Sequence, residues 1–190
     1  METRDLIIRA SKWEDTGVFY QWESRPEVSE FFSISAHLSF ETLAREYIHQ
    51  DEAPDWRQYT ILLKETQEPI GRIILGNLME EWKVEIFRIY IGDPAMRNKG
   101  LGKQAMRAVL ALCFEEWGLK RVYLDHYSGN PASFLYQSLG FSYEGVLRHN
   151  CQKDGILHDV HLMAMLRDEY LKKYHAQDYK GGTHANRIDE

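Results

Sequence analysis

Cysteine is scarce in this chain of 190 residues, which holds only Cys113 and Cys151, and neither belongs to a CxxC motif. A disulfide framework and a cysteine zinc site are therefore both unsupported. No apolar run approaches the ~20 residues of a membrane-spanning helix, and no apolar segment follows a basic start at the N-terminus. We therefore expect a cytoplasmic protein that has no membrane segment and no metal site.

Runs of lysine or arginine are also missing, so the sequence offers no surface for nucleic acid. The formal net charge is -6, and the excess acid lies at the start, where residues 1–57 carry 12 acidic and 6 basic side chains. Two interpretations stay open. These acidic residues lie on ordinary solvated helix faces, or they mark a site that attracts cationic substrates.

The pattern of apolar residues predicts one mixed α/β domain. Strands are predicted at 6–8, 59–63, 70–75, 84–91, 121–124, 141–147 and 157–165, and helices at 13–24, 39–50, 100–117 and 130–139. Short turns predict an antiparallel meander for the second to fourth strands, and Asp154-Gly155 predicts a closing hairpin. We expect a twisted, mostly antiparallel sheet of about seven strands, flanked by about four helices, over residues 1–175. A loosely ordered polar tail, 176–190, should follow.

The most informative stretch is Arg97-Asn98-Lys99-Gly100-Leu101-Gly102-Lys103, which follows a predicted strand and begins a predicted helix. The first N–H groups of a helix have no partner inside it and, with the helix dipole, form an anion site. Glycine lets the backbone approach a phosphate closely because it has no Cβ. Arg97, Lys99 and Lys103 add positive charge. We predict that this turn binds a diphosphate, mainly through backbone amides.

A dinucleotide-binding oxidoreductase is an alternative for the same turn. Gly100-x-Gly102-x-x-Ala105, with Asp125 about 20 residues further on, matches the dinucleotide fingerprint. The predicted order of elements argues against this alternative, because the fingerprint follows the fourth strand of a meander and does not begin a βαβ unit. The chain beyond Asp125 is also too short for a doubly wound sheet. A purely structural glycine turn is the remaining alternative.

Two motifs carry a resemblance to a known family. Arg97-x-x-Gly100-x-Gly102 resembles the (Arg/Gln)-x-x-Gly-x-(Gly/Ala) motif of GNAT acetyltransferases. Residues 130–141, Asn-Pro-Ala-Ser-Phe-Leu-Tyr-Gln-Ser-Leu-Gly-Phe, resemble the second family signature of Asn, a small residue, Tyr and Gly-Phe. The resemblance covers residues 4 to 170. The stretch 154–160 is similar to the closing hairpin of the Rim-type branch, which includes ribosomal-protein alanine and spermidine acetyltransferases.

The resemblance implies an N-acetyltransferase that uses acetyl-CoA as co-substrate and a primary amine as acceptor. The amine would attack the acetyl thioester directly. It also implies that the strand before the glycine turn splays from its neighbour at a bulge, which frees backbone groups for the pantetheine arm. The residues that it implies for CoA binding are Ile89, Tyr90, Ile91, Arg97, Asn98, Lys99, Gly100, Leu101, Gly102, Lys103, Asn130, Ser133 and Tyr136.

Acetyl transfer requires a neutral amine, a stabilised thioester oxygen and a protonated leaving thiolate. The resemblance implies that Tyr136 lies beside the CoA sulfur as general acid. Glu85 is the candidate base, on a strand face that alternation would share with Ile89 and Ile91. Three alternatives stay open. Glu85 could instead form a cross-strand ion pair, the loop acids 80–81 could serve as the base, or the reaction could have no dedicated base.

The acceptor stays open between a polyamine, a protein N-terminus and an antibiotic amine. Trp22, Phe31 and Phe32 flank a loop that lines the acceptor site in this family, although core packing also explains them. A homodimer is expected only from the resemblance. A CoA-binding sensor or scaffold without turnover is the alternative function.

Overall fold

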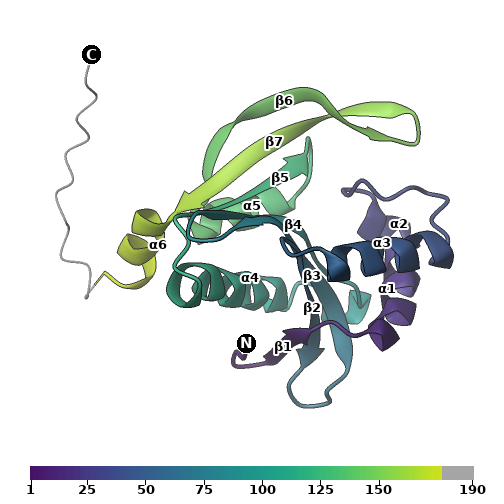
Figure 1. Cartoon of the computed structure of the whole chain (residues 1–190), viewed down its shortest axis with the longest axis horizontal. Helices are drawn as coiled ribbons and strands as arrows, with labels where there is room; N and C mark the ends of the chain where they lie inside the picture. The colour runs from purple at the N-terminus through teal and green to yellow at the C-terminus, as the bar shows by residue number, and fades with distance from the viewer. Residues whose placement is uncertain (177–190) are drawn as a thin grey trace.

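A seven-stranded sheet forms the frame of the molecule (Figure 1). Its strands are β1 (Leu6–Ala10), β2 (Arg57–Leu63), β3 (Pro69–Met79), β4 (Lys83–Ile91), β5 (Arg121–Tyr127), β6 (Ser142–Lys153) and β7 (Ile156–Leu166). They lie in the order β1-β2-β3-β4-β5-β7-β6, and only β4 and β5 pair in parallel. This computed structural model describes residues 1–176, so residues 177–190 of the expected tail lie outside the described residues. The predicted sheet is confirmed.

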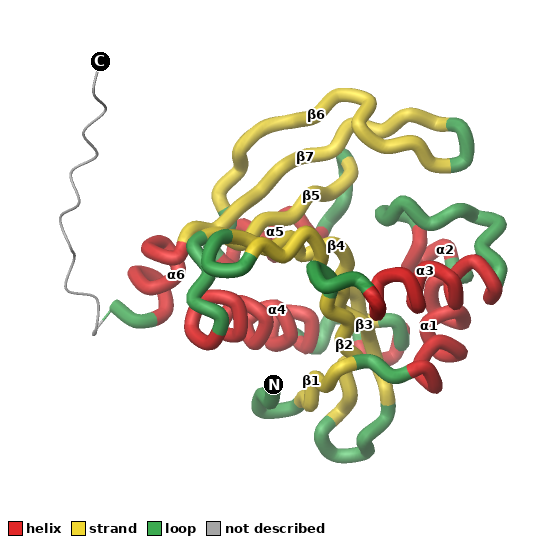
Figure 2. The backbone as a smooth tube through the Cα atoms, viewed as in Figure 1, coloured by secondary structure: helices red, strands yellow, loops and turns green. Residues whose placement is uncertain are grey.

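Six α-helices flank the sheet in the described part of the chain (Figure 2). They are α1 (Thr16–Glu23), α2 (Pro26–Ser29), α3 (Phe40–Glu52), α4 (Leu101–Ala111), α5 (Ala132–Leu139) and α6 (Arg167–Tyr174). Four of them were predicted. The sequence analysis missed α2, a single turn that starts at Pro26, and α6, a polar helix in which only Tyr170 is buried. The predicted long helix at 100–117 is α4 followed by a π-helical turn, Leu112–Glu116.

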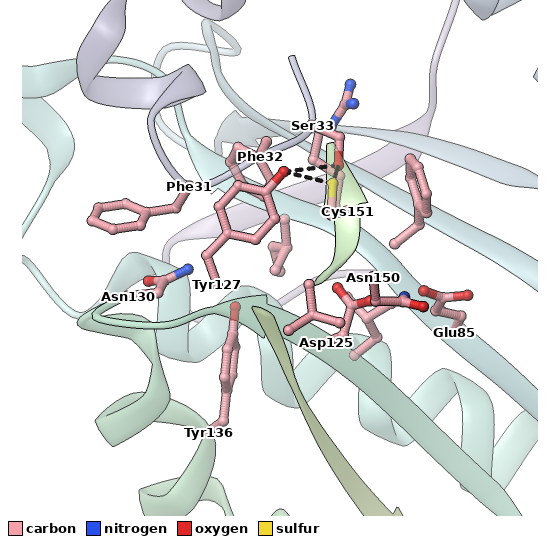
Figure 3. Close-up of a pocket in the computed structure, with 15 residues that line it drawn as sticks. Phe31, Phe32, Ser33, Glu85, Asp125, Tyr127, Asn130, Tyr136, Asn150 and Cys151 are labelled. Carbon is pink, nitrogen blue, oxygen red and sulfur yellow. Dashed lines mark hydrogen bonds between the residues drawn. The ribbon is translucent and has the colours of Figure 1, made fainter. Parts of the chain in front are cut away.

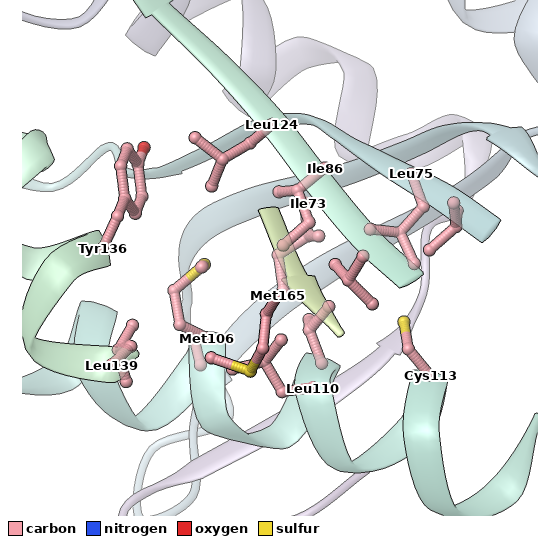
Figure 4. Packing of buried hydrophobic residues seen from close by; sticks show 14 of the residues in the cluster. Ile73, Leu75, Ile86, Met106, Leu110, Cys113, Leu124, Tyr136, Leu139 and Met165 are labelled. Carbon is pink, nitrogen blue, oxygen red and sulfur yellow. The ribbon is translucent and has the colours of Figure 1, made fainter. Parts of the chain in front are cut away.

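The main core lies between α4 and one face of the sheet (Figure 4). The buried residues of α4 recur at helical spacing on one side of the helix, and Met106 and Leu110 pack with Ile73 and Leu75 of β3. A second, smaller cluster on the opposite face joins α1 and α3 to β4. Strand β4 is therefore covered on both sides by helices, which fixes its position.

One extra residue in β4, Phe87, falls between two paired positions of β3 and forms a bulge. Ile86 before the bulge and Ile89 after it both pack on the α4 core, whereas Tyr90 packs against α1. The prediction that Glu85 shares a face with Ile89 is therefore wrong, because a bulge reverses the alternation of side chains.

Strands β4 and β5 separate soon after they begin. They pair only where Lys83–Glu85 lies beside Arg121–Tyr123. Beyond Glu85, β4 turns away from β5, and residues 86–91 keep hydrogen-bonded neighbours only in β3. The predicted splay is confirmed, and it opens the sheet beside the glycine turn.

A buried carboxylate, Glu23, ties α1 to the sheet. It accepts hydrogen bonds from Arg72 (2.7 Å), Arg88 (3.0 Å) and the hydroxyl of Tyr90 (2.7 Å). Burial opposes ionisation of Glu23, but the charges of Arg88 and Arg72 outweigh it and lower the pKa of the carboxyl. The ion pairs thus hold β3 and β4 against α1.

Replacing Glu23 by Gln should lower the free energy of unfolding by about 3–5 kcal/mol, because buried Arg72 loses its carboxylate partner and Arg88 keeps only Glu46, at 3.6 Å. Urea denaturation measures the loss. The control is Glu41→Gln, which removes an exposed pair with Arg45 and should cost no more than about 0.5 kcal/mol. Equal losses in the two variants would contradict a structural role for the buried network.

Candidate active site

An open groove of about 550 Å³ runs along β4 and the starts of α4 and α5. Most of the residues that the sequence analysis assigned to CoA binding line it: Ile89, Tyr90, Ile91, Arg97, Asn98, Gly100, Leu101, Gly102, Lys103, Asn130 and Tyr136. Lys99 and Ser133 lie outside its lining. Segments that are far apart in the sequence therefore meet in one groove.

The start of α4 presents free backbone donors to this groove. Gly100 precedes the helix with a left-handed φ of 76°, and Asn98 also has a positive φ of 59°. Among residues 1–176, no acceptor binds the amides of Leu101, Gly102 and Lys103. A Cβ on Gly100 would meet no atom within 4 Å, so backbone conformation, not space, requires the glycine. The turn has the features of an anion site.

The basic side chains near the turn differ in their contacts. Arg97 bends back to β4, where its Nε donates to the carbonyl of Ile91 (3.0 Å) and an Nη donates to Gly92 (3.4 Å). Lys103 lines the groove, whereas the ammonium of Lys99 lies near the sulfur of a methionine. Arg97 therefore fixes the turn to the end of the strand, and Lys103 is the lysine available to a ligand.

A second, more enclosed cavity of about 170 Å³ lies between β4, β5 and β6 (Figure 3). It shares Phe31, Phe32, Ile89, Asn130 and Tyr136 with the groove, so the two spaces adjoin. We call it the inner cavity. Phe31 and Phe32 therefore lie where a second substrate could reach the groove. Trp22, which the sequence analysis grouped with them, is a buried core residue that packs against Gly92.

Tyr136 lies where the groove and the inner cavity meet. Its side chain comes from α5 and is only 7% exposed, and its hydroxyl forms no hydrogen bond within the described part of the chain. Burial, with a smaller contribution from the charge of Asp125, raises the pKa of Tyr136 to about 12. The hydroxyl is therefore protonated at neutral pH and can donate a hydrogen bond.

Asn130 has a structural role besides its place in the groove. Its side-chain oxygen accepts from the backbone amide of Ala132 (2.9 Å) and so caps the first turn of α5. The residue also lines both the groove and the inner cavity. Capping and ligand contact are compatible, because the cap uses only the carbonyl end of the amide.

Two carboxylates, Glu85 and Asp125, line the inner cavity. Glu85 accepts a hydrogen bond from the side chain of Asn77 (2.6 Å) and forms no ion pair within residues 1–176, so the expected cross-strand alternative is not seen. Burial raises the pKa of Glu85, and the charge of Asp125 adds to that shift. The loop acids 80–81 line a separate hollow.

The sequence analysis gave Asp125 little weight and did not connect Cys151 with the site. The sulfur of Cys151 on β6 lies 2.9 Å from the hydroxyl of Tyr127 and 3.1 Å from that of Ser33, beside the inner cavity. Only the path of the long β6–β7 hairpin brings these residues together. Among the acids of residues 1–57, Glu27 lines the groove and none lines the inner cavity.

Comparison with known proteins decides the family. The model of the acetyltransferase (GNAT) domain matches residues 5–142. The chain belongs to the GNAT acetyltransferase family. A relative named as the uncharacterized N-acetyltransferase p20 of Bacillus licheniformis is 30% identical over 176 residues, which cover 88% of this chain and 96% of that protein.

Other GNAT proteins support the same fold. The spermine/spermidine N(1)-acetyltransferase of Bacillus subtilis is 36% identical over 72 residues, which cover 37% of this chain and 47% of that protein. The structure of the spermidine N-acetyltransferase of Vibrio cholerae in complex with CoA and spermine matches with a TM-score of 0.78. That match has 24% identity and covers 89% of this chain and 99% of the other.

One argument against the dinucleotide alternative was wrong. The glycine turn does join two parallel strands, since β4, α4 and β5 form a βαβ unit. The alternative fails for another reason: Asp125, which would bind the ribose, lines the inner cavity and not the groove at the turn. The sheet is also mostly antiparallel, unlike a doubly wound sheet.

Two further observations concern the described residues 1–176 of this GNAT protein. None of their helices combines the length and the apolar composition needed to cross a bilayer. Their histidine, cysteine and acidic side chains form no cluster of three or more that could hold a metal ion.

Replacing Gly100 by Ala should lower the free energy of unfolding by roughly 1–2 kcal/mol, because a residue with a Cβ disfavours the left-handed conformation. Thermal unfolding measures the change. Gly17→Ala is the matched control: Gly17 lies in α1 with open space around it, so alanine there should stabilise the helix by about 0.5–1 kcal/mol. A stabilising Gly100→Ala would contradict the backbone argument.

Proposed function

We propose that this GNAT protein transfers the acetyl group of acetyl-CoA to a primary amine by direct attack. The observation that carries the proposal is the meeting of two spaces at Tyr136: a groove with free helix-start amides and an inner cavity with two carboxylates. The first fits a diphosphate ligand and the second fits a cationic amine. Relatives named as spermine or spermidine acetyltransferases support an amine acceptor.

The groove offers contacts for the diphosphate and for the pantetheine arm of coenzyme A. The amides of Leu101, Gly102 and Lys103 bind the diphosphate, since unpaired helix-start donors and the helix dipole both attract anions. The backbone of Ile89–Ile91, which β5 leaves unpaired, binds the pantetheine arm. When bound, acetyl-CoA supplies the acetyl group as a thioester, and a backbone N–H of the same strand stabilises the developing charge on its oxygen.

Tyr136 acts as the proton donor to the leaving thiolate. Its raised pKa of about 12 keeps the hydroxyl protonated across the physiological range, and its position between the two spaces puts the donor beside both substrates. Neither cysteine offers a nucleophile for a covalent route. Cys113 lies in the core, where burial raises the pKa of its thiol, and Cys151 is engaged by Tyr127.

Glu85 takes the proton of the acceptor ammonium, directly or through water. A carboxylate whose pKa is raised by burial is a stronger base than a solvated one. The acceptor is a polyamine, a protein N-terminus or an antibiotic amine. A homodimer stays a prediction from family resemblance.

Replacing Tyr136 by Phe should lower kcat about a hundredfold, because the proton donor is lost, while the Kd for CoA should change less than twofold. Steady-state assays with an amine panel and calorimetry measure the two quantities. Tyr143→Phe, at an exposed tyrosine of β6, is the matched control. If Tyr136→Phe turns over as fast as the wild type, Tyr136 is not the proton donor. If the wild type binds CoA but acetylates no amine of the panel, a CoA sensor is favoured.

Replacing Lys103 by Ala should weaken CoA binding about tenfold, because a charge-assisted contact to the diphosphate is lost. Lys99→Ala removes the same charge outside the groove and should change the Kd less than about twofold. Calorimetry with CoA, and with NAD as a second ligand, measures both. Equal effects of the two substitutions would place the diphosphate elsewhere, and tighter binding of NAD than of CoA would favour the dinucleotide alternative.

A further inference from the structure

The charges around the inner cavity do not balance. Arg88 is a basic residue in its lining, but this guanidinium is already paired with Glu23 at 3.0 Å and with Glu46 at 3.6 Å. Glu85 and Asp125 have no basic partner within 4.0 Å in the described part of the chain. The cavity therefore holds two carboxylates whose counter-charge must come from a ligand or from solvent.

Asp125 lines the inner cavity together with Glu85 and Tyr136. It extends from β5 on the same side as Tyr123, which pairs with Glu85 across the two strands. Its charge raises the pKa of both Glu85 and Tyr136, whereas Glu85 has no resolved effect on Tyr136. Figure 3 shows Asp125 between these two side chains. It has no hydrogen-bonding partner of its own within residues 1–176.

A second observation supports a ligand site in the inner cavity. The hydroxyl of Tyr136 is an unpartnered polar group on a side chain that is only 7% exposed, and it points into the same space. A buried hydroxyl normally finds a hydrogen-bond partner. Here the hydroxyl and the two carboxylates line one cavity, so a single bound cation can contact all three.

Aromatic side chains form the walls between these polar groups. Phe31 and Phe32 come from the segment after α2, and Phe87 comes from the bulge of β4. Aromatic faces attract an ammonium group and also pack against the carbon atoms attached to it. The walls and the carboxylates together match a cationic alkyl or benzyl amine better than an uncharged one.

We propose that Asp125 is the residue that selects the acceptor by charge: it binds the reactive amine as an ammonium ion beside Tyr136, before Glu85 receives the proton. The proposal rests on the proposed function of the inner cavity as the acceptor site. It assigns Asp125 a binding role and leaves the proton transfer to Glu85. Acceptors that are uncharged at neutral pH should therefore bind poorly.

Calorimetry with two probes of similar shape tests the proposal. Benzylamine is a cation at neutral pH, and aniline is uncharged. The wild-type protein should bind benzylamine up to about fivefold more tightly than aniline, because Asp125 is exposed and the contact of an ammonium group with an exposed carboxylate is weak. Asp125→Asn should remove the preference and leave the Kd for CoA within about twofold of the wild-type value.

Asp51→Asn is the matched control, because it removes one carboxylate from α3 outside both the groove and the inner cavity. It should keep the preference for benzylamine. Asp125→Glu, which restores the charge, should recover at least part of it. No preference in the wild type, or an unchanged preference in Asp125→Asn, overturns the proposal.

The failure of this inference can be told apart from failure of the proposed function. Both probes are measured with and without saturating CoA. Weak or absent CoA binding with a retained preference for benzylamine contradicts the acetyltransferase mechanism and supports charge selection by Asp125. Tight CoA binding without that preference supports the acetyltransferase mechanism and contradicts charge selection by Asp125.

Discussion

The separation of β4 from β5 is the constraint on which the rest of the site depends. The two strands pair over three residues each and then diverge, so the backbone of β4 beyond Glu85 has a strand neighbour on one side only. Backbone donors and acceptors in a protein interior need partners. The free edge therefore requires a ligand or water, and the same opening makes room for the groove and for the inner cavity.

The surroundings of β4 keep this open edge in place. The α4 core supports one face, and the ion pairs between Glu23, Arg72 and Arg88 support the other. These ion pairs also have an electrostatic consequence. Because Arg88 is neutralised within its own network, it does not offset the charge of Asp125 in the adjoining cavity. A structural network and an acidic binding site can thus lie side by side.

Local sequence signals predicted the parts of the site that depend on local structure. The glycine turn was predictable because left-handed glycine at a helix start leaves a pattern in the sequence, and Tyr136 was predictable because its motif is contiguous. The face of Glu85 was not, since a single bulge at Phe87 reversed the alternation. The positions of Asp125 and Cys151 beside the inner cavity could not be predicted, because they depend on strand pairing between distant segments. The parallel pairing of β4 with β5 was missed, although the predicted helix 100–117 between the two strands is the usual connection of a parallel pair.

The most direct test of the account is a crystal structure with bound coenzyme A. The account predicts that the diphosphate contacts the amides of residues 101–103, that the pantetheine arm hydrogen-bonds to the backbone of Ile89–Ile91, and that the sulfur lies beside the hydroxyl of Tyr136. A pantetheine arm that follows another path, with the edge of β4 left to solvent, would contradict the account.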